Sequence, residues 1–257
     1  MNPLFDLTGQ VVLVTGAAQG LGRAIAEACA AQGAQLVLAD RDERTLAGTA
    51  QALTLRGHAV LALPTDVSDP AALQRLAERA WGWRGRLDTL VCNAGIQGPA
   101  GPLLEVSDED WQRVMDINLH SAQRLCAQLM PRMAGQGGGS VVFMSSLSAL
   151  RGNRAIGLYA LSKAALSQLA RNLAVEWGPQ NLRVNAIAPG LIRTPLAEAL
   201  MRDGAFMQRR MQATPLRRVG EPAEVAGVAV LLASRAGAFI TGQTLVVDGG
   251  TAISDGS

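Results

Sequence analysis

The chain has 257 residues and a formal net charge of +2; hydrophobic residues make up 49% of it and aromatic residues only 4%. This length suits one large α/β domain or two small ones, with an interior built from aliphatic side chains and alanine. The arginines are scattered and are not interleaved with aromatic residues, which argues against a nucleic-acid-binding surface.

The cysteines and histidines are too few and too dispersed for a metal cluster or a disulfide framework. Cys29, Cys92 and Cys126 form no C-x-x-C pair, and His58 and His120 lie far apart. We therefore expect reduced thiols, no metal site and no Ser-His-Asp hydrolase. The N-terminal MNPLFDLTGQ has no basic start or apolar segment, and the apolar run 225–233 is far shorter than the roughly 20 residues of a membrane span. These features predict a soluble, cytoplasmic protein without nucleic-acid or membrane partners.

Apolar runs of strand length alternate with helical patterns along the chain. Strands are predicted at 10–15, 35–39, 59–63 and 88–92, helices at 22–32, 42–56 and 69–81, and a long helix from about Ser107. Further strands are predicted at 140–144, 182–188 and 244–248, a turn at 135–140, and helices around 158–163 and from about Pro222. Continuous aliphatic strands separated by helices predict a parallel sheet buried on both faces. The predicted fold is therefore α/β: a single doubly wound Rossmann-type domain over residues 1–257, with helices on both faces of the sheet.

The first strand ends in TGAAQGLG, which places Gly16, Gly20 and Gly22 at a strand-to-helix turn. Ligands of such sheets bind at the carboxyl ends of the strands, and glycines there let backbone N–H groups approach a pyrophosphate beside a helix N-terminus. The spacing differs from G-x-G-x-x-G, and close packing alone could also require the glycines.

Acidic residues follow the second and third strands. Asp40 is placed to hydrogen-bond an adenosine ribose and to repel a 2′-phosphate, which favours NAD over NADP. The adjacent Arg41 could instead attract that phosphate, and Asp40 could simply cap a helix. Asp66 has two similar interpretations, an adenine contact or a helix cap.

Tyr159 is the only tyrosine of the chain, and Lys163 is the only lysine. Residues four apart on a helix share one face, so the phenol and the ammonium should project together. An ammonium about 4 Å away would lower the pKa of the phenol by about three units, to near 7, where it exchanges protons efficiently. Such a pair suits hydride transfer to and from an alcohol, although most Tyr-x-x-x-Lys pairs are surface neighbours.

The motifs together resemble the short-chain dehydrogenase/reductase family, in its common branch of about 250 residues. The resemblance rests on TGAAQGLG, on NAG at 93–95, on a serine thirteen residues before YALSK, and on PGLIRT at 189–194. It extends over nearly the whole chain, to VDGG at 247–250.

This resemblance implies a catalytic set. Tyr159 matches the general acid/base, and Lys163 the lysine that lowers its pKa and holds the nicotinamide ribose. Ser146 matches the serine that binds the substrate oxygen, and Asn118 the asparagine that organises a proton-relay water. Taken alone, Asn118 could be an ordinary buried hydrogen-bonding residue and Ser146 a turn former.

Two positions near these motifs depart from the pattern or offer alternatives. Ser145 and Ser148 lie beside Ser146, but the spacing selects Ser146. Cys92 stands where the family usually has the first asparagine of Asn-Asn-Ala-Gly, a change expected to affect packing more than catalysis.

The resemblance also implies a cofactor site for NAD, with NADP less favoured. Thr194 matches a residue that binds the nicotinamide carboxamide, although it could serve only the loop before Pro195. The cofactor-binding residues predicted in this way are Gly16, Gln19, Gly20, Leu21, Gly22, Asp40, Arg41, Asp66, Val67, Asn93, Ala94, Gly95, Tyr159, Lys163, Pro189, Gly190, Ile192 and Thr194.

The substrate is only loosely constrained. The connection at about 190–218 is predicted to form a lid, or else a packed extension of the core. By family topology, the substrate side is lined by Ile96, Gln97, Leu147, Ser148, Asn153, Arg154 and Leu191.

The predicted activity is hydride transfer between NAD(H) and a secondary alcohol or ketone such as a polyol, sugar acid or hydroxy acid. The alternatives are an NADPH-dependent 3-oxoacyl reductase and a non-catalytic NAD-binding regulator. Gly137 and Gln180 stand where acyl-carrier-protein reductases tend to carry basic residues, which disfavours the first alternative. The intact Ser-Tyr-Lys set disfavours the second, and the resemblance implies a homotetramer.

Overall fold

The computed structural model describes residues 3–254 and contains a seven-stranded parallel sheet in the order β3-β2-β1-β4-β5-β6-β7. This is the α/β class expected from the sequence. Each strand begins and ends within one residue of its predicted bounds, because buried aliphatic runs are flanked by turn residues on both sides. The strands are β1 (Val11–Thr15), β2 (Gln35–Asp40), β3 (Val60–Pro64), β4 (Thr89–Cys92), β5 (Gly139–Met144), β6 (Leu182–Pro189) and β7 (Thr244–Val247).

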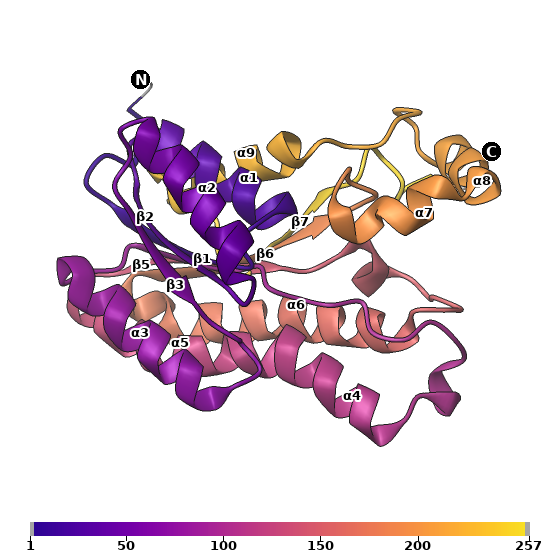
Figure 1. Cartoon of the computed structure of the whole chain (residues 1–257), viewed down its shortest axis with the longest axis horizontal. Helices are drawn as coiled ribbons and strands as arrows, with labels where there is room; N and C mark the ends of the chain where they lie inside the picture. Colours follow the sequence, from indigo (N-terminus) through magenta and orange to yellow (C-terminus); the bar gives the residue numbers. More distant parts are fainter. Residues whose placement is uncertain (1–2, 255–257) are drawn as a thin grey trace.

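Helices connect the strands and cover both faces of the sheet (Figure 1). They are α1 (Gly20–Ala31), α2 (Glu43–Leu55), α3 (Pro70–Arg84), α4 (Asp108–Met115), α5 (Ser121–Gly135), α6 (Gly157–Trp177), α7 (Glu198–Arg202), α8 (Gly204–Ala213) and α9 (Pro222–Ala233). Within residues 3–254, none of the helices is long and apolar enough to cross a membrane.

Alternate residues of each strand build two separate hydrophobic cores. In β1, Val12 and Val14 pack toward α1, α2 and α9, whereas Val11 and Leu13 pack toward α3, α5 and α6. Figure 1 shows these two helical layers on opposite sides of the sheet. A strand buried on both faces has no need of polar alternation, which explains the continuous aliphatic runs.

The long helix predicted from Ser107 begins as expected but contains an interruption. The Ser107 side chain caps α4 by accepting a hydrogen bond from the Asp110 N–H. Between α4 and α5, residues Asp116–His120 form a π-helical turn, which rotates the side chains that follow relative to a regular helix. This turn carries Asn118.

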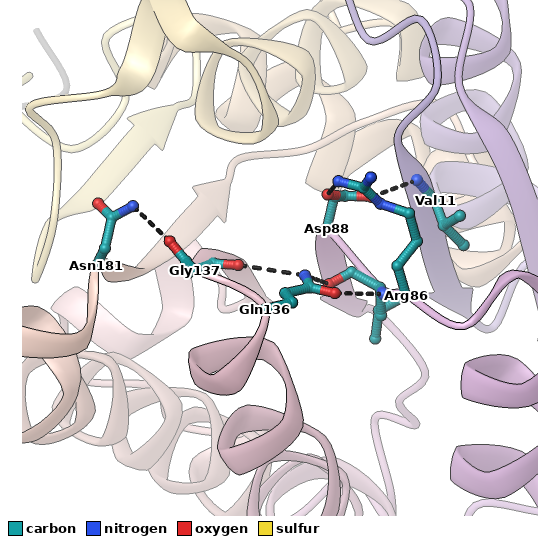
Figure 2. Close-up of polar contacts among 8 residues, drawn as sticks. Val11, Arg86, Asp88, Gln136, Gly137 and Asn181 are labelled. Atoms are coloured by element: carbon teal, nitrogen blue, oxygen red, sulfur yellow. Dashed lines mark hydrogen bonds and ion pairs between the residues drawn. The ribbon is translucent and has the colours of Figure 1, made fainter.

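Polar contacts link the amino ends of several strands (Figure 2). Asp88, just before β4, accepts hydrogen bonds from the Val11 N–H at 2.8 Å and from Arg86 Nε at 3.0 Å. Gln136, at the end of α5, bonds both the N–H and the carbonyl of the residue before Asp88. Asn181 Nδ2 donates to the carbonyl of the turn between α5 and β5 at 2.8 Å. This network ties β1, β4, β5 and β6 together at the edge opposite the cavity described next.

Candidate active site

A cavity of about 860 Å³ opens at the carboxyl ends of the strands, where the strand order reverses between β1 and β4. The predicted cofactor and substrate residues line this cavity, with the exception of Gly22, and so do Ser146, Tyr159 and Lys163. Asn118 is not part of the lining. Residues far apart in the sequence therefore meet where the topology predicts.

The glycine turn after β1 is packed too closely for larger side chains. A Cβ atom on Gly22 would lie 2.1 Å from the Gly16 carbonyl oxygen, and one on Gly16 would lie 2.8 Å from Asn93 Nδ2. Asn93 Nδ2 donates to the carbonyls of Thr15 and Gly16 at 2.9 and 3.1 Å, which fixes the turn against β4. Close packing thus explains Gly22, which lies beneath the cavity surface.

The N-terminus of α1 faces the cavity without a side-chain cap. The N-cap residue, Gln19, makes no side-chain capping bond within the described residues, and the first turn carries no acidic residue. Free N–H groups at a helix N-terminus attract anions, so this turn fits a phosphate group of a dinucleotide.

Neither of the two acidic side chains expected at the cofactor site caps a helix. The caps of α2 and α3 are Asp42 and Asp69. Asp40 instead accepts hydrogen bonds from the backbone N–H groups of Ala18 and Asp42, both at 3.0 Å, which holds its carboxylate beside the glycine turn. Asp66 accepts from the Ser68 N–H and hydroxyl, and these bonds lower the pKa of its carboxyl group. Both carboxylates line the cavity, as a ribose or adenine contact requires.

Of the three neighbouring serines, Ser146 is the one hydrogen-bonded to the tyrosine. The Ser145 hydroxyl donates to the Lys163 carbonyl at 2.8 Å and contacts Ser167 Oγ at 2.9 Å, so it fastens β5 to α6. The Ser146 side chain accepts from the Ser148 N–H at 3.1 Å and is hydrogen-bonded to Tyr159. The spacing argument therefore selected the serine that lies beside the phenol.

Tyr159 and Lys163 lie on one face of α6, but their charges interact differently from the sequence-based expectation. Lys163 Nζ donates to the Met144 carbonyl at 2.8 Å and lies 5.6 Å from the centroid of the Tyr159 ring. Burial raises the pKa of Tyr159, and the bond with Ser146 only partly offsets this. Burial also lowers the pKa of Lys163 to about 8. The expected lowering of the tyrosine pKa toward 7 is therefore wrong for this structure, because desolvation outweighs the charge of a lysine that bonds elsewhere.

Asn118 is buried in the π-helical turn, and its side chain is engaged by other parts of the chain. Its Oδ1 accepts from the Ile96 N–H at 2.8 Å, and its Nδ2 donates to the Ile96 carbonyl and to Ser162 Oγ, both at 2.9 Å. These bonds join the loop after β4 to α6. The Asn118 side chain therefore connects the loop after β4 to α6 and is not among the residues that line the cavity.

Cys92, the departure from the usual Asn-Asn-Ala-Gly, is buried at the end of β4. It is in hydrogen-bonding contact with Cys126 of α5, and this contact together with burial raises the pKa of the Cys126 thiol. None of the three cysteines forms a disulfide, and residues 3–254 contain no cluster of His, Cys, Asp or Glu that could hold a metal ion.

Several residues of the cavity were not identified from the sequence. Thr65, Arg151, Ile156 and Arg210 line it without belonging to any motif of the chain. Arg210 lies on α8 in the predicted lid. The sequence of this short helix does not indicate which of its faces meets the cavity. Only the adjacent arginines at 209 and 210 could have marked this part of the lid as a candidate.

The comparisons with known proteins agree with this geometry. A family model described as enoyl-(acyl carrier protein) reductase matches residues 16–252. Dehydrogenase/reductase SDR family member 4 of Oryctolagus cuniculus is 37% identical over 244 residues, which cover 95% of this chain and 94% of that protein. The chain belongs to the short-chain dehydrogenase/reductase family. As a short-chain dehydrogenase/reductase, it is an oxidoreductase that acts on CH–OH groups.

Solved structures of other short-chain dehydrogenases/reductases superimpose closely. A gluconate 5-dehydrogenase from Burkholderia cenocepacia in complex with NADP and tartrate has a TM-score of 0.93 and 32% identity, with 98% of each chain covered. A 7α-hydroxysteroid dehydrogenase complexed with NADH and 7-oxo glycochenodeoxycholic acid has a TM-score of 0.92 and 34% identity, with 97% of each chain covered. Similar folds thus bind either nicotinamide cofactor and chemically different small molecules.

Proposed function

We propose that this protein catalyses reversible hydride transfer between NAD(H) and the carbon of a secondary alcohol or ketone. The observation that carries the proposal is the meeting of Ser146, Tyr159 and Lys163 at one cavity beside the glycine turn. A nicotinamide cofactor supplies the hydride acceptor or donor in this chemistry. The chain itself has to bind the alcohol oxygen and move its proton.

The proposed roles follow from the geometry of these side chains. Ser146 and Tyr159 bind the substrate oxygen, and Tyr159 takes the hydroxyl proton as the alcohol carbon loses hydride. Burial raises the pKa of Tyr159 and keeps the phenol protonated at neutral pH in the ligand-free protein, which is the form needed to donate a proton to a ketone. Oxidation of an alcohol requires the phenolate, which the positive charges of Lys163 and of bound NAD would favour. Lys163 and Asn118 position the groups around the phenol, Lys163 through its charge and Asn118 through the loop after β4.

The residues proposed for the cofactor are those expected from the family resemblance and found along the cavity. The free N-terminus of α1 would hold the phosphates, and the backbone-anchored carboxylate of Asp40 would bind the adenosine ribose. Because a carboxylate repels a 2′-phosphate, we favour NAD, although Arg41 also lines this end of the cavity.

The segment 190–218 is proposed as a lid over the substrate end. It forms α7 and α8, and Leu196, Phe206 and Arg210 from it line the cavity. Polyols, sugar acids and hydroxy acids are the proposed substrate classes, supported by the similarity to a gluconate 5-dehydrogenase. A cytoplasmic homotetramer, implied by the resemblance alone, stays a prediction that cell fractionation and light scattering would test.

The test is a cofactor-reduction screen with the purified full chain. NAD and NADP are each combined with secondary alcohols, polyols, sugar acids and hydroxy acids, and the reduced cofactors with ketones and 3-oxoacyl thioesters. We expect turnover of at least one alcohol and ketone pair with NAD. Tight NADH binding without any turnover would support the non-catalytic regulator, and turnover limited to 3-oxoacyl thioesters with NADPH would support the reductase.

A further inference from the structure

Acidic and basic residues are unevenly distributed along the cavity, with Arg41 beside the acidic residues and three further arginines at the substrate end. Asp40 and Asp66 are the only acidic residues that line it within the described chain, and both lie at the glycine-turn end. Arg151, Arg154 and Arg210 line the substrate end. Arg151 and Arg154 come from the loop between β5 and α6, and Arg210 comes from α8 of the lid.

Arg210 is the least satisfied of these arginines. Its Nε is buried, and no residue within 3–254 accepts a hydrogen bond from it. The guanidinium lies 5.5 Å from the centroid of the Phe206 ring, one helical turn earlier on α8. Burial lowers the pKa of Arg210, and the nearby positive charge of Arg151 lowers it further. A buried guanidinium N–H without an acceptor is costly, so this site favours an anion.

Asp248 is an acidic residue whose charge acts on Arg210, but the two form no ion pair. Asp248 favours the charged form of Arg210, but its own carboxylate accepts hydrogen bonds from the backbone N–H groups of Gly250 and Ala252. By contrast, another partly buried arginine, Arg183, donates to the carbonyls of residues 232 and 237. No carboxylate within residues 3–254 forms an ion pair with Arg210 or Arg151.

We propose that Arg210, with Arg151 beside it, binds a carboxylate group of the substrate, so that the enzyme acts on hydroxy acids and their oxo acids. This inference rests on the proposed function, because the reacting alcohol carbon must lie at Ser146 and Tyr159 in the same cavity. The carboxylate itself is unchanged. The alcohol carbon gives its hydride to NAD, the hydroxyl proton passes to the phenolate form of Tyr159, and the product is the oxo acid. The planar guanidinium fork matches a carboxylate in two parallel hydrogen bonds, and binding there would draw α8 onto the substrate.

Matched substrates and a matched variant test the proposal. Each aldonate, such as gluconate, is compared with the alditol of the same chain length, which has CH₂OH in place of the carboxylate. We expect the wild type to prefer the aldonate, and Arg210→Gln to lower its kcat/KM about 100-fold, mainly through KM. Arg209→Gln is the control, because it removes the same charge from an exposed position on the same helix, and it should leave both substrates unaffected.

A binding measurement keeps the test independent of turnover. Titration calorimetry with Tyr159→Phe should detect aldonate binding that is lost in Tyr159→Phe/Arg210→Gln, while NADH binding and the melting temperature stay the same. Equal use of aldonates and alditols, or an Arg210→Gln effect of the same size on both, would overturn the carboxylate assignment while leaving the dehydrogenase function intact. Tighter binding of a sugar phosphate than of the aldonate would also overturn it. If no substrate is turned over and none binds, the proposed function itself fails.

Discussion

At the amino edge of the sheet, the Asp88 carboxylate accepts hydrogen bonds from the Val11 N–H and from Arg86. At the carboxyl edge, the buried ammonium of Lys163 has a single hydrogen bond within the described residues, to the Met144 carbonyl. Both are charged groups near strand ends. The first has its hydrogen-bonding partners within the chain, and the pKa of its partner Arg86 is raised by the pairing. The second is desolvated without a carboxylate nearby, so its pKa falls to about 8.

This difference indicates that polar residues at the amino edge of the sheet serve mainly stability, whereas those at the carboxyl edge serve the proposed active site. Polar side chains at the amino edge close the sheet and leave few groups free for a ligand. At the carboxyl edge, burial opposes the charged forms of Lys163 and Tyr159 beside the cavity, and such perturbed pKa values are typical of functional sites. Variants at the two edges should therefore have opposite consequences, with activity lost at one edge and stability lost at the other.

The largest effect is expected for Tyr159→Phe. Removal of the phenolic hydroxyl deletes the proposed proton carrier, and general acid/base groups contribute roughly 10²–10⁴-fold to rates. We expect kcat to fall by about three orders of magnitude, with NADH affinity and the free energy of unfolding almost unchanged. Stopped-flow turnover and fluorescence titration of NADH measure the two quantities. A variant with wild-type activity would contradict the assigned role.

At the opposite edge, Asp88→Ala should mainly reduce stability. The substitution leaves the buried Val11 N–H without its acceptor and breaks the pairing with Arg86, and hydrogen bonds to charged groups are worth roughly 1.5–3 kcal/mol. We expect the free energy of unfolding to fall by about 3 kcal/mol, measured by urea denaturation, with kcat unchanged for the folded enzyme. Arg86→Ala is the control, because it spares the bond to Val11 and should cost less than about 1 kcal/mol. Equal losses in the two variants would show that the ion pair, not the backbone contact, stabilises this edge.

Lys163→Met should abolish activity and yet stabilise the protein. Because burial lowers the pKa of Lys163 from 10.5 to about 8, the charged side chain lowers the free energy of unfolding by about 3 kcal/mol at pH 7. The variant is relieved of this cost but loses the bond to Met144, which is worth about 1 kcal/mol. The free energy of unfolding of the variant should therefore exceed that of the wild type by about 2 kcal/mol well below pH 8. This difference disappears as the pH rises past 10.5. Between these values the unfolded chain holds the proton and the folded protein does not, so wild-type stability increases with pH.

The single lysine makes this prediction directly measurable. A protein labelled with ¹⁵N-lysine gives one side-chain signal, whose titration should have its midpoint near pH 8. Lys163→Arg is the control, because it keeps a charge at the same depth and should lose activity without gaining stability. Titration near 10.5, or a Lys163→Met protein no more stable than the wild type at pH 7, would contradict the assigned cost of burial.

The single tyrosine allows the corresponding test on Tyr159. Its pKa in the ligand-free enzyme, followed by tyrosinate absorbance, should lie above that of free tyrosine, because burial raises it. Saturation with NAD would bring the positive charge of the nicotinamide ring to the proposed site and should lower the pKa of Tyr159, whereas NADH should not. A ligand-free midpoint near 7 would restore the expectation drawn from the Tyr-x-x-x-Lys spacing.

The fold was largely predictable because its signals are local. Aliphatic runs such as 35–39 sit between turn residues, and the glycine turn and the PGLIRT segment mark strand ends that the topology brings to one edge. The i, i+4 spacing likewise predicted that Tyr159 and Lys163 share a face.

What could not be predicted depends on contacts between distant segments. The π-helical turn at Asn118 is held by Ile96 and Ser162, and the direction of Lys163 Nζ depends on where the Met144 carbonyl lies. Neither has a signature along the chain. The same holds for Arg210, whose place in the cavity depends on how α8 packs.

The smallest expected effect is at the proposed cofactor end, where Asp40 both bonds to the backbone and lines the cavity. Its carboxylate anchors the backbone of Ala18 and Asp42, as at the amino edge, and also faces the cavity. Asp40→Asn keeps an acceptor for one of these bonds while removing the charge that repels a 2′-phosphate. We expect the ratio of kcat/KM for NAD to that for NADP to fall about 10-fold, which corresponds to 1.4 kcal/mol. Arg41→Ala should shift the ratio in the opposite direction, because it removes a cation beside that position. If the wild type prefers NADP and Arg41→Ala abolishes that preference, then Arg41 determines the choice of cofactor and Asp40 belongs with Asp88, as a residue that serves the fold.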